Sequence, residues 1–379
     1  MSDLSITLDA LARSRSQLSV SCYFDEGLFR REQDLIFEHG PRYLGHELSV
    51  PEPGDFHALA QEGEGRALVR TPRGVELVSN VCRHRQAVML RGRGNTKSSI
   101  VCPLHRWTYD LTGRLIGAPH FADDPCLNLN NYPLQTWNGL VFEASRKTAG
   151  RNIATDLARL EPTAELDFSG YVFDRVFMHE CAYNWKTFIE VYLEDYHVGP
   201  FHPGLGNFVT CENLRWEMGE HYSVQTVGIA TPGGKALGRP GSDVYEKWHE
   251  VVLNYRDGQA PKQGAIWLTC YPNVMVEWYP HVLVVSTLFP QGPQKTLNMV
   301  EFFYPEEIVA FEREFVQAQQ AAYMETCVED DEIALRMDAG RKALLARGDD
   351  EFGPYQSPME DGMQQFHEWY HKAMGRQRS

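Results

Sequence analysis

Two short stretches of the sequence each place a cysteine close to a histidine. Residues 82 to 84 read CRH and residues 102 to 105 read CPLH, so each stretch can form a tight loop that offers one thiolate and one imidazole. Thiolates are soft, strongly donating ligands and imidazoles are neutral and weaker, so two of each can divide between the irons of a [2Fe-2S] cluster. The predicted cluster ligands are Cys82, His84, Cys102 and His105.

A structural zinc site is the alternative for these four residues, because zinc accepts the same cysteine and histidine ligands. Zinc sites of this composition usually keep both cysteines in one knuckle. Here each loop supplies one thiol and one imidazole instead. This order of residues favours the cluster, and the zinc-binding protein stays as a hypothesis from another class.

A second group of candidate ligands lies in residues 190 to 203, which read EVYLEDYHVGPFHP. If a helix runs through the first part of this stretch, Glu194 and His197 are three positions apart and share one face. We expect the Gly-Pro pair at 199 and 200 to break that helix. The break would let His202 turn back towards His197, so that both imidazoles reach one metal ion.

Two imidazoles and one carboxylate form the ligand set of mononuclear non-haem Fe(II). The helix predicted after Cys327 supplies a candidate carboxylate. Asp330 precedes Ile333 by three positions and Met337 by seven, so it projects on the apolar face, whereas Asp331 points about 100° away. A helix N-cap is the alternative role for Asp330. The pair of histidines, which lacks an oxygen ligand, favours Asp330 as the third iron ligand.

Residues 367 to 371 read HEWYH. They match the H-E-x-x-H signature of zinc peptidases, in which two histidines bind zinc and the glutamate is the base. A catalytic zinc needs a third protein ligand, and the residues after His371 offer none. We therefore interpret His367 and His371 as rim residues of a terminal helix, and a zinc peptidase built on His367, Glu368 and His371 is the disfavoured alternative.

The elements that must position these residues follow from the pattern of the chain. Short β-rich runs alternate with glycine and proline turns from about residue 56 to residue 144, which predicts a small all-β domain within residues 41–150. Residues 151–379 are predicted to form a catalytic domain, in which an antiparallel sheet is covered by helices. Residues 1–40 are predicted as an N-terminal helical segment that packs on this domain. The fold class is therefore α+β.

Three helices are predicted in the last part of the chain. Apolar residues recur at steps of three and four between Pro305 and Cys327, and again from about residue 330 to residue 346. The last helix is expected to open with a capping box from Ser357 to Glu360. These helices are expected to pack on the sheet.

Composition and charge exclude several classes of protein. A formal net charge of −15 over 379 residues argues against a nucleic-acid partner, because phosphate binding rests on clustered Lys and Arg. The first twenty residues lack the apolar core of a signal peptide, and no stretch is long enough to span a bilayer. We therefore expect a cytoplasmic protein with no membrane partner. The eight cysteines fit a reduced compartment, in which cysteines ligate metals before they form disulfides.

The CRH and CPLH loops resemble those of the Rieske iron-sulfur proteins, which carry C-x-H and C-x-x-H in this order. The Pro103, Trp107 and Tyr109 that accompany the second loop are also common there. Two residues depart from the usual pattern: Gln86 and Arg106 stand where glycine is common. Neither replaces a ligand, so the departures bear on the reduction potential and the docking surface of the cluster and not on its presence.

Residues 184 to 203, NWKTFIEVYLEDYHVGPFHP, resemble the iron-binding segment of the Rieske non-haem iron oxygenases, the large (alpha) subunits of ring-hydroxylating and demethylating systems. The resemblance implies one [2Fe-2S] cluster and one Fe(2+) per subunit, with iron ligands His197, His202 and Asp330. It also implies that Glu194 is an inter-subunit electron bridge, from the cluster of one subunit to the iron of the next. The unit is usually a trimer, and here a homotrimer is expected.

The same resemblance implies a terminal oxygenase that needs a flavin-dependent reductase, NAD(P)H and O2, with or without a ferredoxin. A glutamate at the bridging position is more similar to the choline, betaine and carnitine oxygenase branch than to the dihydroxylating branch. The expected reaction is therefore hydroxylation or oxidative demethylation of a small molecule such as a quaternary amine. Dihydroxylation or monooxygenation of an aromatic compound is the alternative. The sheet residues that could surround a quaternary ammonium or stack on a ring are Trp267, Tyr271, Trp278 and Tyr279.

Overall fold

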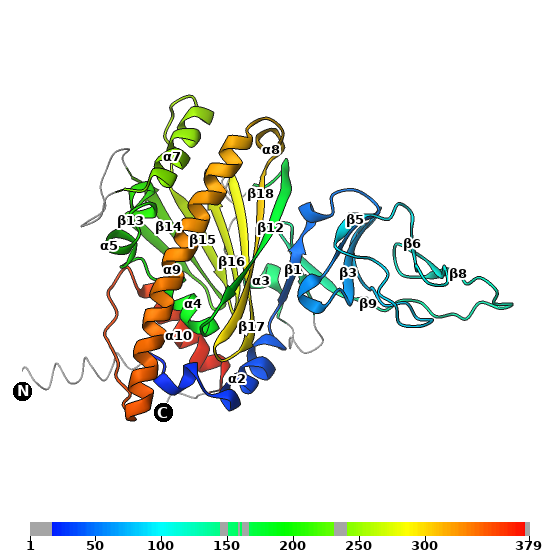
Figure 1. The fold of residues 1–379 in the computed structure, drawn as a ribbon, viewed down its shortest axis with the longest axis horizontal. Helices are drawn as coiled ribbons and strands as arrows, with labels where there is room; N and C mark the ends of the chain where they lie inside the picture. Colours follow the sequence, from blue (N-terminus) through cyan, green and yellow to red (C-terminus); the bar gives the residue numbers. More distant parts are fainter. Residues whose placement is uncertain (1–16, 145–150, 158–159, 161–166, 231–240, 376–379) are drawn as a thin grey trace, which may run out of the picture. The chain divides into compact units, whose positions relative to one another are not determined.

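The computed structural model describes residues 17–144, 151–157, 160, 167–230 and 241–375. The chain forms two compact units (Figure 1). The small unit is Glu38–Pro162, and the large unit combines Met1–Phe37 with Thr163–Ser379. The assignment of residues 1–40, 41–150 and 151–379 to three functional domains stays a prediction. In the structure the second division lies later than residue 150, because Gln135 holds the following segment by hydrogen bonds to the backbone of Arg151 and Ile153.

The small unit is made of short antiparallel strands. They form a five-stranded sheet in the order β5-β2-β3-β4-β9 and two three-stranded sheets in the orders β1-β11-β10 and β6-β7-β8. The strands are β1 (Arg42–His46), β2 (Asp55–Ala58), β3 (Arg66–Thr71), β4 (Gly74–Ser79), β5 (Arg93–Asn95), β6 (Ser99–Val101), β7 (Thr108–Asp110), β8 (Leu115–Gly117), β9 (Asn131–Tyr132), β10 (Leu134–Trp137) and β11 (Leu140–Glu143). One helical turn, α3 (Ile153–Asp156), follows them.

The two predicted cluster loops leave this β structure at neighbouring points. The CRH loop follows the end of β4, and the CPLH loop joins β6 to β7. Both cysteines belong to one apolar core with Val78, Ile100 and Trp107. Because these side chains are buried, the core fixes the base of each loop while the loop tips stay at the surface.

The large unit contains a seven-stranded antiparallel sheet in the order β12-β18-β17-β16-β15-β14-β13. Its strands are β12 (Tyr171–Cys181), β13 (Val209–Met218), β14 (Tyr222–Ile229), β15 (Ala265–Cys270), β16 (Val274–Tyr279), β17 (Val282–Gly292) and β18 (Lys295–Pro305). The helical segments are η1 (Val20–Tyr23), α2 (Glu26–Glu32), η2 (Gln33–Phe37), α4 (Trp185–Tyr192), α5 (Val198–Phe201), α6 (Leu205–Phe208), α7 (Asp243–Tyr255), α8 (Glu306–Phe311), α9 (Arg313–Arg347) and α10 (Asp361–Ala373).

Helix α9 is 35 residues long and crosses one face of the seven-stranded sheet (Figure 1). It contacts α7 and α4. The prediction of two separate helices before and after residue 328 is wrong, because the chain breaks at Glu312 and then stays helical to Arg347. Asp330 therefore lies in the interior of a long helix. An N-cap role for Asp330 is excluded, since a cap stands at a helix start.

The described part of the N-terminal segment packs within the large unit. Leu18, Tyr23 and Ile36 share a core with Trp185 of α4 and Phe366 of α10. Buried polar bonds add to this contact, and Lys186 donates to Glu32 at 2.6 Å. The predicted helical content of residues 1–16 lies outside the described residues.

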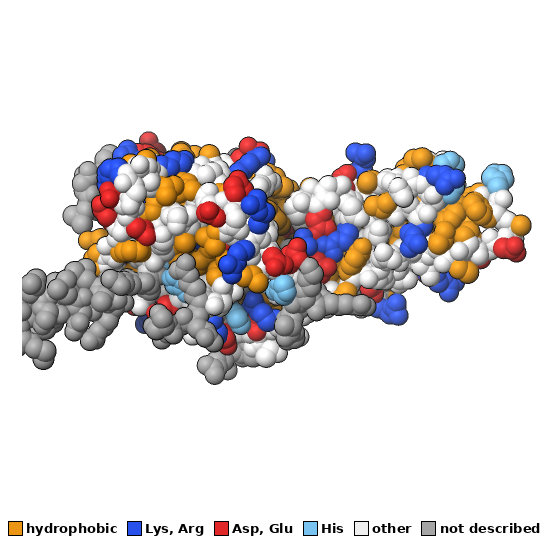
Figure 2. Space-filling view, turned by 90° about the horizontal axis from the view of Figure 1, so that it is seen from below, with side chains coloured by type: hydrophobic (Ala, Val, Ile, Leu, Met, Phe, Trp, Pro, Cys, Tyr) orange, Lys and Arg blue, Asp and Glu red, His pale blue; other side chains and the backbone are white. Residues whose placement is uncertain are grey.

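The α+β prediction is confirmed: the small unit is all-β, and helices cover the antiparallel sheet of the large unit. Within the described ranges, none of the helices combines the length and the apolar character that crossing a bilayer requires. On the face drawn in Figure 2, basic side chains are interspersed with acidic ones and do not gather into a stripe.

Candidate active site and cluster loops

The two cluster loops share one backbone arrangement. The backbone N–H of Cys82 donates to Ala87 O at 2.9 Å, and that of Cys102 donates to Trp107 O at 2.8 Å. Four residues after each cysteine, Gln86 and Arg106 adopt left-handed φ angles of 58° and 61°. Only glycine takes this conformation without steric cost, which explains why glycine would be favoured at both positions. Equivalent turns therefore present the two Cys-His pairs.

The side chains of these loops are arranged as a two-iron cluster requires. Cys82 and Cys102 are buried, whereas His84 is partly exposed and His105 is exposed. The two imidazole rings lie 4.6 Å apart between centroids, and His84 stacks on Trp107 at 5.0 Å. Two inner thiols and two outer imidazoles fit a cluster whose histidine-bound iron faces the surface.

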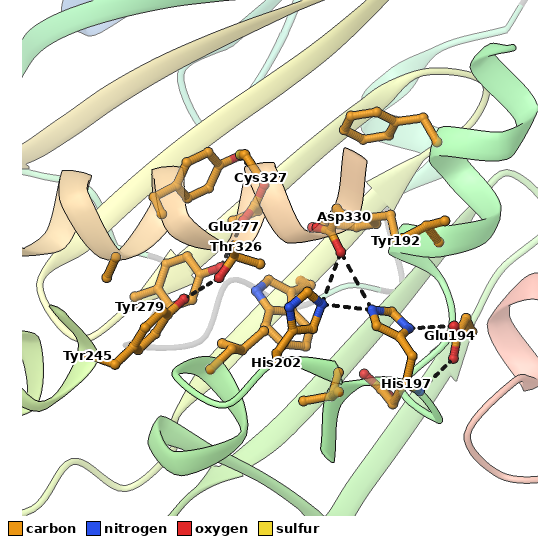
Figure 3. Close-up of a pocket in the computed structure, with 18 of the residues that line it drawn as sticks. Tyr192, Glu194, His197, His202, Tyr245, Glu277, Tyr279, Thr326, Cys327 and Asp330 are labelled. Carbon is orange, nitrogen blue, oxygen red and sulfur yellow. Dashed lines mark hydrogen bonds and ion pairs between the residues drawn. The ribbon is translucent and has the colours of Figure 1, made fainter. Parts of the chain in front are cut away.

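Three side chains of the second predicted group converge in the large unit (Figure 3). His202 Nε2 lies 3.0 Å from Asp330 Oδ1 and 2.9 Å from His197 Nε2, and His197 Nε2 lies 3.5 Å from the same carboxylate oxygen. Burial alone would raise the pKa of Asp330, but hydrogen bonds from both histidines lower it to about 2. Two Nε2 atoms and one carboxylate oxygen directed at a common point are a donor set for a divalent metal ion.

Two further carboxylates orient the imidazoles. Nδ1 of His197 donates to Glu194, and Nδ1 of His202 donates to Glu329 Oε2 at 2.7 Å. A proton held on each Nδ1 leaves the Nε2 lone pair free for a metal. The sequence predicted the contact of Glu194 with His197 and missed Glu329. The only signal for Glu329 in the sequence was its position directly before Asp330, and in the structure both residues contact His202.

The backbone around the histidines differs from the prediction. Helix α4 ends at Tyr192, before Glu194, and His197 precedes the short helix α5. Gly199 and Pro200 lie inside α5, so the prediction that they break a helix is wrong. The contact between Glu194 and His197 comes instead from a turn, in which Glu194 also accepts the backbone N–H of His197 at 3.1 Å.

Asp331, the residue after Asp330, makes different contacts. Asp331 accepts a hydrogen bond from Tyr183 at 2.6 Å and another from His179 of β12 at 2.7 Å. Cys181 lies close to His179, so these side chains also resemble a ligand group. Direct hydrogen bonds already satisfy the Asp331 oxygens, and we assign this group to the packing of α9 on β12.

A pocket opens beside the three converging ligands. Its lining includes aromatic residues of the sheet and helices, namely Tyr192, Tyr245, Trp248, Trp267, Tyr279 and Tyr323. Of the aromatic residues singled out in the sequence, Trp267 and Tyr279 line this pocket. Tyr271 instead packs in another core with Trp369, and Trp278 is not among the lining residues. Alternation along β16 explains the difference, because residues 277 and 279 share one face and residue 278 takes the other.

The pocket also holds a carboxylate that sequence reasoning missed. Glu277 of β16 is 3% exposed, and it accepts hydrogen bonds from Tyr279 and Tyr323, both at 3.0 Å. Burial raises the pKa of Glu277 to about 7, although the two tyrosine hydroxyls act in the opposite direction. A single glutamate within a β-rich run gave no sign in the sequence that it would face a pocket.

The HEWYH stretch belongs to a structural network. His367 is buried, so its interpretation as a rim residue is wrong, whereas His371 is partly exposed. Tyr355 bonds to His367 Nδ1 at 2.6 Å, and Nε2 of His367 bonds to Glu190 at 2.8 Å. Both ring nitrogens of His367 thus have protein partners, and among the described residues neither His367 nor His371 belongs to a group that could hold a metal ion. The predicted capping box is also wrong, since α10 starts at Asp361 without a side-chain cap.

Two family models match the chain. The model described as "Ring hydroxylating alpha subunit (catalytic domain)" matches residues 168–376, and the model described as "Rieske [2Fe-2S] domain" matches residues 42–134. The second match supports the iron-sulfur cluster over a structural zinc site in the CRH and CPLH loops. Neither match corresponds to a zinc peptidase.

Curated relatives and solved structures agree with these models. The putrescine 2-hydroxylase of Ralstonia nicotianae is 66% identical over 99% of this chain and 100% of that relative. The putrescine 2-hydroxylase of Bordetella bronchiseptica is 60% identical over 96% of this chain and 85% of that relative. A solved quaternary ammonium Rieske monooxygenase shares the fold with a TM-score of 0.70, at 18% identity over 94% of each chain.

Proposed function

Because the chain belongs to the Rieske oxygenases with a ring-hydroxylating alpha catalytic domain, we propose that it hydroxylates the aliphatic diamine putrescine, 1,4-diaminobutane, at carbon 2. The oxygenase class and the hydroxylation of a small molecule follow from the family and the relatives. The substrate is the proposal. The 66% identity over nearly the whole chain to a putrescine 2-hydroxylase is the observation that carries it.

His197, His202 and Asp330 would hold one Fe(2+), which when bound supplies the activation of O2. The donor set fits this ion, since the Nε2 atoms and the carboxylate oxygen converge while Glu194 and Glu329 hold the protons on Nδ1. The protein also keeps the reaction away from bulk water, because aromatic side chains surround the adjacent pocket.

We propose that Glu194 is the inter-subunit bridge between the two metal sites. It bonds to the side chain and to the backbone N–H of His197, and its side chain is 15% exposed. A carboxylate oxygen has lone pairs for more than one donor, so a cluster histidine of a neighbouring subunit can also bond to Glu194. This arrangement requires an oligomer, for which we propose a homotrimer.

As an oxygenase of this family, the protein needs electron-transfer partners. We propose a flavin-dependent reductase that draws on NAD(P)H, with or without a ferredoxin, and a location in the cytoplasm. Hydroxylation replaces one C–H bond of the substrate by C–OH with one atom of O2. The other oxygen atom leaves as water, which takes up two electrons and two protons. The reductase supplies both electrons through the cluster.

The test is turnover of the holoenzyme with a generic flavin reductase, NADH and 18O-labelled O2. We expect 1,4-diaminobutane to yield one hydroxylated product that carries a single 18O atom. The rate of this reaction should exceed the rate of product formation from choline, carnitine or an aromatic acid. Demethylation of choline or carnitine at a higher rate would restore a quaternary amine as the substrate. Hydroxylation of the aromatic acid alone would favour the aromatic alternative.

A further inference from the structure

Glu277 occupies an unusual environment for a carboxylate. It lies on β16, opposite Trp267 of the neighbouring strand, and its side chain lines the pocket beside His202 and Asp330. In Figure 3, Glu277, Tyr279 and Tyr245 lie on one side of the three converging ligands, whereas Glu194 lies on the opposite side. Glu277 thus lines the pocket on the side of these ligands that is away from the proposed electron bridge.

The described pocket residues that can carry a positive charge are His179, His197 and His202, and they bond to other carboxylates, namely Asp331, Asp330 and Glu329. Among the described residues that line the pocket there is neither a lysine nor an arginine. The titratable groups that influence Glu277 or are influenced by it are Tyr279 on its own strand, Tyr192 of α4, and Tyr323, Cys327 and Asp330 of α9. None of these groups carries a positive charge. A buried carboxylate in such surroundings is costly unless a cation joins it.

The hydrogen bonds around Glu277 leave room for one more partner. Tyr279 donates to Oε2 and Tyr323 donates to Oε1, so each carboxylate oxygen keeps an unused lone pair. A primary ammonium carries three N–H donors and a positive charge. It would fill these acceptors and neutralise the carboxylate, while the rings of Trp267 and Tyr279 would contact its methylene groups.

We propose that Glu277, supported by the hydroxyls of Tyr279 and Tyr323, is the anchor for a primary ammonium group of the substrate. The assignment rests on the proposed function in one respect, that the substrate is an aliphatic amine. It adds a reason for selectivity, because a quaternary ammonium has no N–H to donate to these oxygens. Glu277 is a substrate-binding residue in this account and has no part in holding iron.

The anchor predicts how amine binding depends on pH. Burial raises the pKa of Glu277 to about 7, whereas an aliphatic ammonium stays charged well above that pH. As the pH rises from 6 to 8, more of the protein carries the ionised carboxylate that the ammonium requires. Affinity for the amine should therefore increase with pH while the carboxylate titrates, and level off once it is ionised.

The experiment measures the dissociation constants of 1,4-diaminobutane and 1-butylamine by calorimetry, without O2, on the holoenzyme and on Glu277→Gln. The matched control is Glu217→Gln, since Glu217 also accepts a tyrosine hydrogen bond, from Tyr222 at 2.9 Å, but does not line the pocket. We expect Glu277→Gln to weaken binding of both amines about 30-fold or more and to abolish the pH dependence. Glu217→Gln should bind as the wild type does.

Iron, sulfide and the visible spectrum establish that each variant is folded and loaded. Unchanged amine affinity in a loaded Glu277→Gln, measured at pH 8, would overturn the anchor. If 1,4-diaminobutane binds through Glu277 but is not hydroxylated, the proposed function fails while the anchor stands. If the loaded variant hydroxylates it with wild-type affinity, the anchor fails while the function stands.

Discussion

The two groups of ligand residues are constructed in opposite ways. All four cluster candidates lie between residues 82 and 105, and each loop is closed by its own backbone hydrogen bonds. The proposed ligands in the large unit come from distant parts of the chain: His202 and Glu329, the residue directly before Asp330, are 127 positions apart. In the large unit, carboxylates that accept hydrogen bonds from the imidazole Nδ1 atoms orient the histidines. In the loops, backbone hydrogen bonds orient the ligands instead.

This difference indicates how each site should respond to the substitution of neighbouring side chains. A loop held by backbone bonds keeps its shape when a nearby side chain changes, so such changes should tune the cluster without removing it. A site held by side chains depends on each orienting carboxylate. Substitutions around the converging histidines should therefore cost metal binding, whereas comparable substitutions around the cluster should change only its properties.

Asp330→Ala should have the largest effect. The variant removes the only anionic ligand of the converging group and leaves the helix intact, since alanine is a good helix former. We expect oxygenation to fall by more than about 100-fold, with the mononuclear iron lost and the two cluster irons retained. Iron and acid-labile sulfide analysis checks this. Full iron content in the variant would show that Asp330 is not a ligand.

Glu329→Gln should have an intermediate effect, because it weakens the acceptor for His202 Nδ1–H without touching a ligand. We expect a loss of about 10- to 100-fold in iron affinity, measured by titration of the metal-depleted protein. Glu332→Gln is the control on the same helix, since Glu332 bonds only to the exposed Arg336 among the contacts described. Equal iron affinity in the two variants would contradict the orienting role.

Tyr109→Phe should have the smallest effect. The Tyr109 hydroxyl lies 3.6 Å from Cys82 Sγ, and a hydrogen bond to a cluster thiolate stabilises the reduced, more negative state. If the bond is stronger in the reduced state by about 0.5–1.5 kcal/mol, its removal should lower the reduction potential by roughly 20–60 mV, with the cluster still bound. Redox titration followed by visible absorbance measures the shift, and loss of the cluster would show that this loop is not held by its backbone.

The same contrast explains what could be predicted from the sequence. The cluster loops were predictable because their spacing encodes their geometry. The stripe of Ile333 and Met337 predicted Asp330 but was wrong to place Asp331 away from the protein, since the Asp331 side chain is 29% exposed against 33% for Asp330. The path of the chain around His197 could not be predicted, because α4 stops before Glu194 without a glycine or proline to indicate its end.

The remaining residues of the site could not be predicted because their positions depend on long-range contacts. Glu277 faces the pocket only because β16 pairs with β15 and β17 in one register, and a one-residue slip would exchange it for Trp278. Glu329 meets His202 only once α9 lies along the sheet. His367 was predicted as a rim residue, and its buried partner Glu190 lies 177 positions away. Such contacts depend on tertiary packing that no local pattern encodes.

The most direct test of the account concerns Glu194, which we propose to couple the two sites. Reduced holoenzyme with bound 1,4-diaminobutane is mixed rapidly with O2, and the absorbance of the cluster is followed in the wild type and in Glu194→Ala. We expect the wild-type cluster to reoxidise as product forms. Glu194→Ala also loses an orienting carboxylate, so it is assayed with excess Fe(2+), under which it should hold both metals while its cluster stays reduced. Reoxidation of the cluster at the wild-type rate in the iron-loaded variant would contradict the proposed bridge.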